Sequence, residues 1–349
     1  MQKKVDYLIV GQGIAGSFLA FQLLKEGKTI KVIDKGFSSS SSWVAAGVIN
    51  PLVLKRLTVT WRAVEFMAYN QEFYTGLAKL IGKNHLHHIP LLKLISSDDE
   101  RKFWQHRYHK VNLAPFVNEK LESADSLSLP LTKSYDLGRL KVTAWVDLKA
   151  FLADFRSYLE KKGALLEESF VHRDLKENDY RHLSFDKVVF CEGAAAKQNP
   201  HCKHLPFSFN KGELLTLSSN QINLNEMLKK KVFVLPSAKN EFKVGASYER
   251  NFTDEEPTRE KKAWLEEQFK EITTADYQIK AHEAGVRPAV MDRRPLLGAL
   301  GKSNCFVFNG LGSRGCFMAP LLSKELVDYM EKGKGLHPEA CIRRFSKTI

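Results

Sequence analysis

Two stretches of the sequence carry glycines at the spacing G-x-G-x-x-G, which is typical of loops that hold the pyrophosphate of a dinucleotide. One is GQGIAG at residues 11–16, and the other is GLGSRG at residues 310–315. In such a loop the first glycine permits a tight turn, and the second lets the backbone approach the phosphates. The third lets the helix pack closely on the strand, and the pyrophosphate meets the free N–H groups at the helix N-terminus.

The N-terminal stretch lies in a complete β-α-β pattern. KVDYLIV at 4–10 has the composition of a strand, SFLAFQLLKEG at 17–27 has a broad apolar helical face that ends at a glycine, and KTIKVID at 28–34 is typical of a second strand. Asp34 ends this strand, at about the place where an acid binds the ribose hydroxyls. We therefore expect the N-terminal stretch to hold the dinucleotide.

The C-terminal stretch has a different context. CFVF at 305–308 is strand-like and APLLSKELVDYMEKG at 319–333 is helix-like, but no apolar strand ending in an acid follows. A second β-α-β unit is therefore not expected here. Two interpretations stay open: a glycine-rich turn into a helix, or a helix N-terminus directed at an electron-rich group other than the pyrophosphate.

Length and composition limit the classes of protein to which this chain can belong. The 349 residues are enough for two domains, and 44% hydrophobic with 27% charged residues is typical of a globular chain. No apolar run approaches the roughly 18 residues of a membrane span, and the basic N-terminus lacks a cleavage site, so neither a span nor a signal peptide is expected. Five cysteines without C-x-x-C spacing predict reduced thiols and a cytoplasmic protein.

The formal net charge of +13 has two interpretations. Lysines and arginines occur in short clusters, and a well-solvated basic surface explains them. Alternatively, the summed charge attracts a polyanion such as RNA.

Further segments carry a family resemblance: SSSSSWVAAGVINPL (38–52), KVVFCEGAAA (187–196), AGVRPAVMDRRPLLGAL (284–300) and FNGLGSRGCFMAP (308–320). With these motifs in order over nearly the whole chain, the sequence resembles the FAD-dependent family of D-amino-acid oxidase, glycine oxidase and sarcosine oxidase. Within it, AGVINPL, DRRPLLGAL and GLGSRGCFMAPL are most similar to the FAD-dependent oxidase half of the bifunctional enzyme that makes 5-methylaminomethyl-2-thiouridine in tRNA. No segment resembles its methyltransferase half.

The resemblance implies an α/β fold in which a Rossmann-like FAD-binding domain is interrupted by a mixed-sheet α+β substrate domain. We assign 1–80, 140–205 and 283–349 to the FAD-binding domain, and 81–139 and 206–282 to the substrate domain. Within the latter we expect a basic and aromatic helix over 98–110 and strands within 212–217, 230–236 and 241–249.

The resemblance also implies a non-covalently bound FAD. Its pyrophosphate would lie at the N-terminal glycines, and Asp34, where the family usually has Glu, would meet the ribose. The helix that Gly312–Gly315 open would direct N–H groups at the N1–C2=O edge of the flavin, where negative charge collects on reduction. The cofactor residues implied are Gly11, Gly13, Ile14, Ala15, Gly16, Asp34, Lys35, Ser42, Ala46, Gly47, Val171, Gly193, Gly312, Ser313, Arg314 and Gly315.

Two of these cofactor residues come with specific expectations. Val171 matches a strand whose backbone meets adenine, and Gly193 matches a loop behind the cofactor. Glu192 departs from the small residue that is usual there.

Three residues are candidates for catalysis or substrate binding. Arg287 matches the family arginine that binds a substrate carboxylate through two parallel hydrogen bonds, and the alternative is an arginine that pairs with an internal carboxylate or extends to solvent. Arg314 lies in the flavin-side loop, and Tyr248 on an expected strand is placed to support the carboxylate or simply to pack. We predict no metal site, because His282-Glu283 lacks a second histidine four residues on.

The implied reaction is oxidation of the C–N bond of a carboxylate-bearing amine with the unit N–CH2–COO⁻. Candidate substrates are a small amine such as glycine, sarcosine or a D-amino acid, or the carboxymethylaminomethyl group of a tRNA wobble uridine. Molecular oxygen or another acceptor would take the electrons, so oxidase and dehydrogenase both stay open. The alternative of another class is a flavoprotein whose FAD is structural or regulatory.

Overall fold

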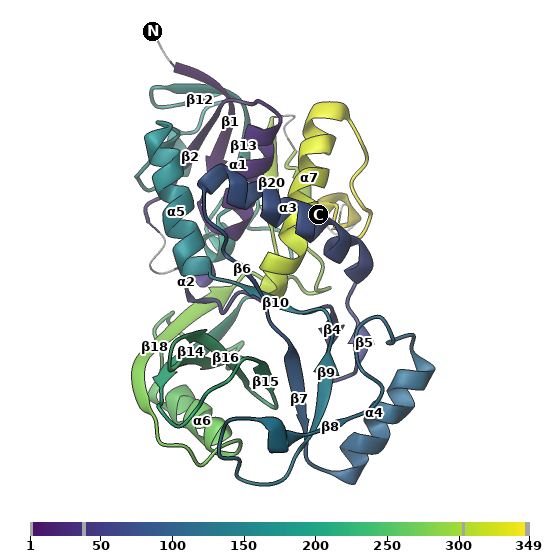
Figure 1. Cartoon of the computed structure of the whole chain (residues 1–349). Helices are drawn as coiled ribbons and strands as arrows, with labels where there is room; N and C mark the ends of the chain where they lie inside the picture. Colours follow the sequence, from purple (N-terminus) through teal and green to yellow (C-terminus); the bar gives the residue numbers. More distant parts are fainter. Residues whose placement is uncertain (1–2, 37–39, 302–303, 346–349) are drawn as a thin grey trace.

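The computed structural model describes residues 3–36, 40–301 and 304–345. The chain forms two sheet-based layers, which occupy the upper and lower halves of Figure 1. Ser38 and Ser39 of the serine run lie outside the described residues.

The upper layer is built on a seven-stranded sheet. In spatial order its strands are β11 (Leu165–Leu166), β2 (Ile30–Ile33), β1 (Lys3–Val10), β13 (Leu183–Phe190), β20 (Cys305–Asn309) and β19 (Leu296–Ala299), with β12 (Asp179–Tyr180) beside β13. From β11 to β20 neighbouring strands are parallel, and β19 and β12 pair antiparallel. The central strand β1 is buried from Tyr7 to Val10, as expected for a parallel strand with both faces covered.

Four helices belong to this layer: α1 (Ile14–Lys25), α3 (Ala63–Ile81), α5 (Leu148–Lys161) and α7 (Gly315–Lys332). Helix α1 is apolar on nearly all sides because it packs between the sheet and the other helices. Gly27, with φ of +73°, ends its last turn as the sequence predicted.

The lower layer is an eight-stranded mixed sheet. In spatial order its strands are β18 (Gln278–Arg287), β14 (Asn210–Ser218), β17 (Glu241–Gly245), β16 (Phe233–Ala238), β15 (Met227–Lys229), β7 (Leu91–Ile95), β9 (Asp136–Leu140) and β8 (Glu122–Ser123). All pairs are antiparallel except β15 with β7. Helix α6 (Arg259–Lys270) covers one face, where Leu265 and Phe269 pack with Leu215 and Leu217.

Smaller elements join the layers. A three-stranded sheet contains β3 (Val48–Ile49), β10 (Ala144–Val146) and β6 (Leu86–His88), and β4 (Leu52–Val53) pairs with β5 (Thr58–Val59). The remaining α-helices are α2 (Ser41–Val44) and α4 (Asp98–Lys110). Single turns of 3-10 helix occur at Ala124–Ser126, His172–Asp174, Gly193–Lys197, Gly312–Arg314 and Ile342–Phe345.

The predicted fold class is confirmed: a Rossmann-like α/β layer is interrupted in sequence by a mixed-sheet layer. The helix expected over 98–110 forms as α4, while the strand expected within 230–236 begins only at Phe233. Strand β18 crosses the proposed boundary between 282 and 283, and β6 pairs with β10 although it falls within 81–139. The domain boundaries stay a prediction.

Among the described residues, none of the helices combines the length and the apolar character needed to cross a bilayer.

Helix α7 depends on an unusual arrangement in its first turns. Pro320 lies inside the helix and has no N–H group to donate to the carbonyl oxygen of Cys316. The buried hydroxyl of Tyr74, from α3, donates to this oxygen instead at 2.7 Å. Asn70, one turn earlier in α3, donates to the carbonyl oxygen of Phe317 at 3.1 Å. Helix α3 therefore holds the start of α7 in place.

We expect Tyr74→Phe to destabilise the fold by about 1–3 kcal/mol, because it leaves a buried carbonyl oxygen without a donor. Denaturant unfolding of the two proteins measures this difference. Tyr158→Phe is the matched control, since the Tyr158 hydroxyl has no hydrogen-bond partner among the described residues. Equal stability of the Tyr74 variant and the wild type would contradict this account of α7.

Candidate active site

The N-terminal glycine loop connects β1 to α1 and has no room for a side chain at Gly11 or Gly16. Gly11 has φ of +100°, and a β-carbon there would lie 2.6 Å from the carbonyl oxygen of Cys191, directly after β13. A β-carbon at Gly16 would overlap the carbonyl oxygen of Gly11. These two glycines thus permit the tight turn and the close contact of α1 with the loop that a dinucleotide cradle requires.

The N-terminus of α1 is open apart from one side chain. The Ser42 hydroxyl oxygen, on α2, accepts a hydrogen bond from the Ile14 N–H at 3.1 Å. A β-carbon at Gly13, the N-cap, would lie 3.0 Å from the same oxygen. Ile14, Ala15 and Gly16 are buried in the first turn. Ser42 therefore lies at the place where this helix would meet an anion.

Asp34 at the end of β2 is bound to the glycine loop itself. Its Oδ2 accepts from the Gln12 N–H at 2.7 Å, and its Oδ1 accepts from the Gly36 N–H at 2.8 Å. Arg156 of α5 lies 3.3 Å from the same Oδ1. The carboxylate can still accept from a ribose, since a carboxylate has about four acceptor positions. Lys35, the next residue, is exposed.

The two glycine patterns meet in space. A β-carbon at Gly315, the first residue of α7, would lie 3.3 Å from Cδ1 of Ile14, the first residue of α1. The N-termini of α1 and α7 therefore lie side by side. Both patterns thus belong to one site, in which the C-terminal pattern opens a helix beside the N-terminal cradle.

The C-terminal glycine loop also contacts the end of β18. The Gly312 N–H donates to the carbonyl oxygen of Pro288 at 3.0 Å, one residue after Arg287. Gly310 has φ of +74°, and a β-carbon there would lie 2.6 Å from Val290. Ser313 in the same loop is exposed. The loop therefore joins Arg287 to the N-terminus of α7.

Arg314 ties this loop to the segment after β3. Its Nη1 donates to the carbonyl oxygen of Asn50 at 2.6 Å, and its Nη2 donates to that of Leu52 at 3.0 Å. Burial lowers the pKa of Arg314 to about 10. Part of its donor capacity is thus engaged by the backbone, which favours a positioning role over direct catalysis.

Ala46 and Gly47 lie on the same connection between α2 and β3. Ala46 is buried, and Gly47 has φ of +74°. A β-carbon at Gly47 would overlap the carbonyl oxygen of Val146 in β10. Glycine is therefore required for the close approach of this segment to β10.

The expected adenine side differs from the prediction in one respect. Val171 lies outside any strand and instead caps the 3-10 turn His172–Asp174. Its N–H donates to the Tyr180 hydroxyl at 3.1 Å, and its carbonyl oxygen accepts from the Asp174 N–H. Both backbone groups of Val171 thus have internal partners, since the short turn replaces the expected strand.

Gly193 and Glu192 follow β13 at the same edge of the sheet. Gly193 has φ of +56° and accepts a hydrogen bond from Asn309 at 3.0 Å. Glu192, the unexpected residue, is held by His172 at 2.9 Å and by Asn199 at 2.5 Å. These neutral or weakly basic partners explain how a nearly buried carboxylate is accommodated next to the glycine loop.

Arg287 ends β18 on the sheet face opposite α6. Its Nη1 donates to the Asn210 side-chain oxygen at 3.0 Å, and both Nη atoms lie 3.4 Å from the carbonyl oxygen of Ser247. Gly212, on the neighbouring strand, leaves the space that the guanidinium fills, and a β-carbon there would overlap it. Burial lowers the pKa of Arg287 below its usual value, and the nearby Tyr248 offsets only part of this effect.

No carboxylate among the described residues pairs with Arg287, so the interpretation as an internal ion pair is not supported. Asn210, Gly212 and Ser247 were missed in the sequence, because their role depends on the register of β14 with β17 and β18.

Tyr248 does not lie on the expected strand, because β17 ends at Gly245. It follows in a loop, is 59% exposed, and accepts a hydrogen bond from Arg250 at 3.4 Å. The loop carries both Ser247 and Tyr248 past the Arg287 guanidinium. Tyr248 is thus at the edge of the site and is not packed across a sheet.

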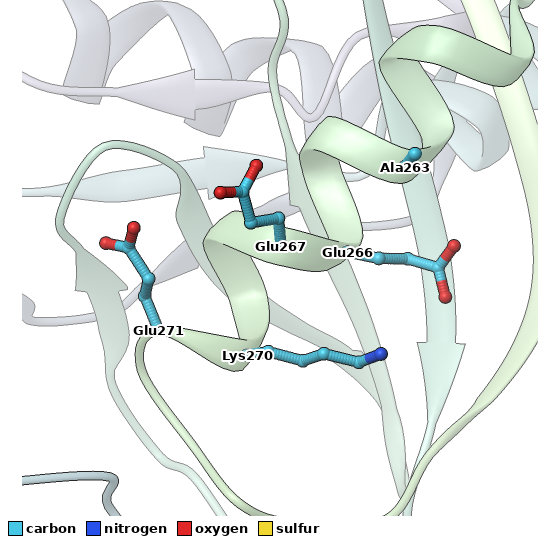
Figure 2. A pocket seen from close by; sticks show the side chains of 5 residues that line it. All are labelled: Ala263, Glu266, Glu267, Lys270 and Glu271. Carbon is cyan, nitrogen blue, oxygen red and sulfur yellow. The ribbon is translucent and has the colours of Figure 1, made fainter.

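A shallow hollow on α6 is a poor candidate for the site. Figure 2 shows that its side chains spread outward from the helix, namely Ala263, Glu266, Glu267, Lys270 and Glu271. Helix α6 covers the face of the sheet opposite Arg287. No group of His, Cys, Asp or Glu within residues 3–36, 40–301 and 304–345 is arranged to hold a metal ion.

Comparison with known proteins agrees with this geometry. The chain is 24% identical over 339 residues to the tRNA 5-methylaminomethyl-2-thiouridine biosynthesis bifunctional protein MnmC of Idiomarina loihiensis, covering 91% of this chain and 54% of that protein. It is also 24% identical over 349 residues to glycine oxidase of Pseudomonas aeruginosa, covering 93% and 94%. The chain therefore spans about half the length of the bifunctional relative and nearly all of glycine oxidase.

Among solved structures, glycine oxidase from Geobacillus kaustophilus superimposes with a TM-score of 0.79 at 18% identity, covering 97% of this chain and 98% of that one. This likeness shows the shared fold. The model of the FAD dependent oxidoreductase family (DAO) matches residues 6–329, which include both glycine patterns and Arg287. The chain therefore belongs to the FAD-dependent oxidoreductase family and is an FAD-dependent enzyme.

Proposed function

We propose that this enzyme oxidises the C–N bond of an amine that carries the unit N–CH2–COO⁻, with Arg287 binding the carboxylate. The observation that carries the proposal is the environment of Arg287. Its guanidinium has an amide oxygen and a backbone carbonyl as partners and no internal carboxylate among the described residues. A partly buried cation of this kind is stabilised when an anionic ligand pairs with it.

The residues around the glycine loops fit FAD. Gly11 and Gly16 form a cradle that β-carbons would fill, and the Ile14 N–H at the N-terminus of α1 donates to the Ser42 hydroxyl. We propose that the pyrophosphate lies there, with the ribose near Asp34 and the flavin near Gly312–Gly315. The N-terminus of α7 supports this placement, because no side chain of the described residues caps it and its dipole favours negative charge.

The protein's own residues orient the substrate and shape its surroundings. Bound FAD supplies the two-electron oxidation chemistry. Arg287 would fix the carboxylate through two parallel hydrogen bonds and so set the position of the adjacent methylene. Tyr248, at the exposed edge, is placed to cover the bound carboxylate. Water then hydrolyses the resulting imine to an amine and glyoxylate, and oxygen or another acceptor takes up the electrons.

Within this substrate class we infer that the amine is the carboxymethylaminomethyl group of a tRNA wobble uridine. The net charge of +13 and the similarity to the bifunctional tRNA-modifying relative favour a polyanionic substrate. Glycine oxidase is equally similar over its whole length, so a free amino acid is the competing substrate that experiment must distinguish.

We expect Arg287→Met to keep the bound FAD and the fold but to weaken binding of carboxylate-bearing amines by about 2–5 kcal/mol, because the substrate charge loses its buried partner. Anaerobic bleaching of the flavin against substrate concentration measures this loss.

Arg293→Met is the matched control, since Arg293 is exposed, lies six residues further on and removes the same charge. Unchanged concentration dependence in the Arg287 variant would assign Arg287 a structural role and move the carboxylate site elsewhere.

We expect the flavin to be FAD and to be held without a covalent bond. Acid precipitation should release all of it into the supernatant, where chromatography separates FAD from FMN. Colour that remains with the pellet would show that a covalent link exists.

We expect bulk tRNA that contains carboxymethylaminomethyl uridine to be converted to the aminomethyl form when incubated with the enzyme. Nucleoside mass spectrometry measures the conversion, and its apparent affinity should fall steeply with salt because bound phosphates release counterions. Bleaching by glycine or sarcosine at enzymatic rates, with unchanged tRNA, would identify a small-molecule oxidase. Absence of bleaching by every amine would favour a structural or regulatory FAD.

A further inference from the structure

An arginine occupies the buried face of helix α5. The apolar side chains of this face recur at helical spacing and are Leu148, Phe151, Leu152, Phe155 and Leu159. Arg156 lies on the same buried side and is only 9% exposed. A charged side chain on this face needs polar partners, and α5 packs beside α1 and β11.

Those partners are the glycine loop and the acid at the end of β2. Nη1 of Arg156 donates to the Gln12 side-chain oxygen at 2.8 Å and lies 3.3 Å from Oδ1 of Asp34. Gln12 is the residue between the first two glycines of the loop, and it is fully buried. Its side-chain nitrogen donates to the carbonyl oxygen of Leu152 at 3.1 Å, so α5 holds both ends of this amide.

The contacts among Gln12, Asp34 and Arg156 form a closed ring of hydrogen bonds. The Gln12 N–H donates to Oδ2 of Asp34 at 2.7 Å, while Arg156 contacts both the Gln12 side chain and the other carboxylate oxygen. Three segments far apart in sequence are thus locked together around the first turn of the loop. Removing Arg156 leaves the buried Gln12 oxygen without its donor and takes away one of the contacts that orient the Asp34 carboxylate, beside those from the N–H groups of Gln12 and Gly36.

The charge of Arg156 is balanced within the protein. Its Nη2 lies 3.2 Å from Glu167, and its Nε lies 3.6 Å from Glu160, and both of these carboxylates are largely exposed. With Asp34, three carboxylates surround one guanidinium. Arg156 is therefore not arranged as a phosphate ligand, in contrast to Arg287.

We propose that Arg156 is a positioning residue for the adenosine end of the cofactor. It fixes the glycine loop through Gln12 and the direction of the Asp34 carboxylate, so that both are preorganised before FAD binds. A short acid needs this support, because aspartate has one methylene fewer than glutamate with which to reach a ribose. The inference rests on the FAD position proposed above, and it does not depend on the identity of the amine.

The test titrates apoprotein with FAD and follows the change in flavin fluorescence. We expect Arg156→Met to raise the Kd for FAD by about tenfold to a hundredfold, the effect of losing charge-assisted hydrogen bonds. Arg156→Lys should give an intermediate Kd, since an ammonium keeps the charge but cannot bridge Gln12 and Asp34 as a planar fork does.

Competition by ADP and by FMN, each of which resembles one half of FAD, shows which end of the cofactor loses affinity in the Arg156 variants. ADP, used as a competitor, should lose affinity in the Arg156 variants in parallel with FAD, whereas FMN should compete as it does with the wild type. Arg139→Met is the control for loss of a hydrogen-bonded arginine, because Arg139 pairs with Glu122 in the eight-stranded sheet, where both side chains are more exposed than Arg156 and Asp34. It should leave the Kd for FAD unchanged even if it lowers Tm.

An unchanged Kd for FAD in Arg156→Met would overturn the proposal. So would equal weakening of FAD, ADP and FMN, or equal weakening in the Arg139 variant, because these results indicate a general structural role. If neither ADP nor FMN competes with FAD, the proposal is tested by comparing the Kd for FAD of the Arg156 variants with that of the Arg139 variant. None of these measurements uses an amine substrate, so failure of the proposed oxidation leaves the result intact.

Discussion

The contact between the first residues of α1 and α7 is the constraint on which the rest of the site depends. A helix N-terminus carries partial positive charge and N–H groups without partners, and here two of them lie side by side. Gly315 favours this close approach, because a β-carbon there would lie only 3.3 Å from Cδ1 of Ile14. An anionic group placed between them satisfies donors of both helices at once. The repeated glycine spacing at the two ends of the chain is thus explained by one shared site.

The position of α7 in turn depends on α3. A proline in the second turn would normally disrupt the helix, but Tyr74 supplies the missing donor to Cys316. The Gly312 N–H fixes the preceding loop to Pro288, directly after Arg287. The C-terminal glycine loop is therefore hydrogen-bonded to the residue that follows Arg287. A shift of α7 would therefore move both the C-terminal glycine loop and the segment that follows Arg287.

The elements that depend on contiguous sequence patterns could be predicted from the sequence. The site contacts that depend on pairing between distant segments could not. The β-α-β unit with Gly11, Gly16 and Asp34 is contiguous, so strand composition, helix periodicity and glycine spacing identify it. The expected strand at Val171 is a 3-10 turn, since Tyr180 takes its N–H. Tyr248 was placed on a strand that ends three residues earlier. The partners of Arg287 and Arg156 depend on registers and helix packing that no local pattern records.

The centre of the upper sheet pairs β1 with β13 and β13 with β20, so its neighbours come from the beginning, middle and end of the chain. The same is true of the cradle, which needs Gly11 at one end and Gly315 at the other. During synthesis the N-terminal loop emerges early, but its partner helix leaves the ribosome only when almost all of the described residues have been made. The two glycine loops of the candidate site therefore come together only after most of the described residues have been made. Until β20 has been made, the edge of β13 that it covers lacks its partner strand.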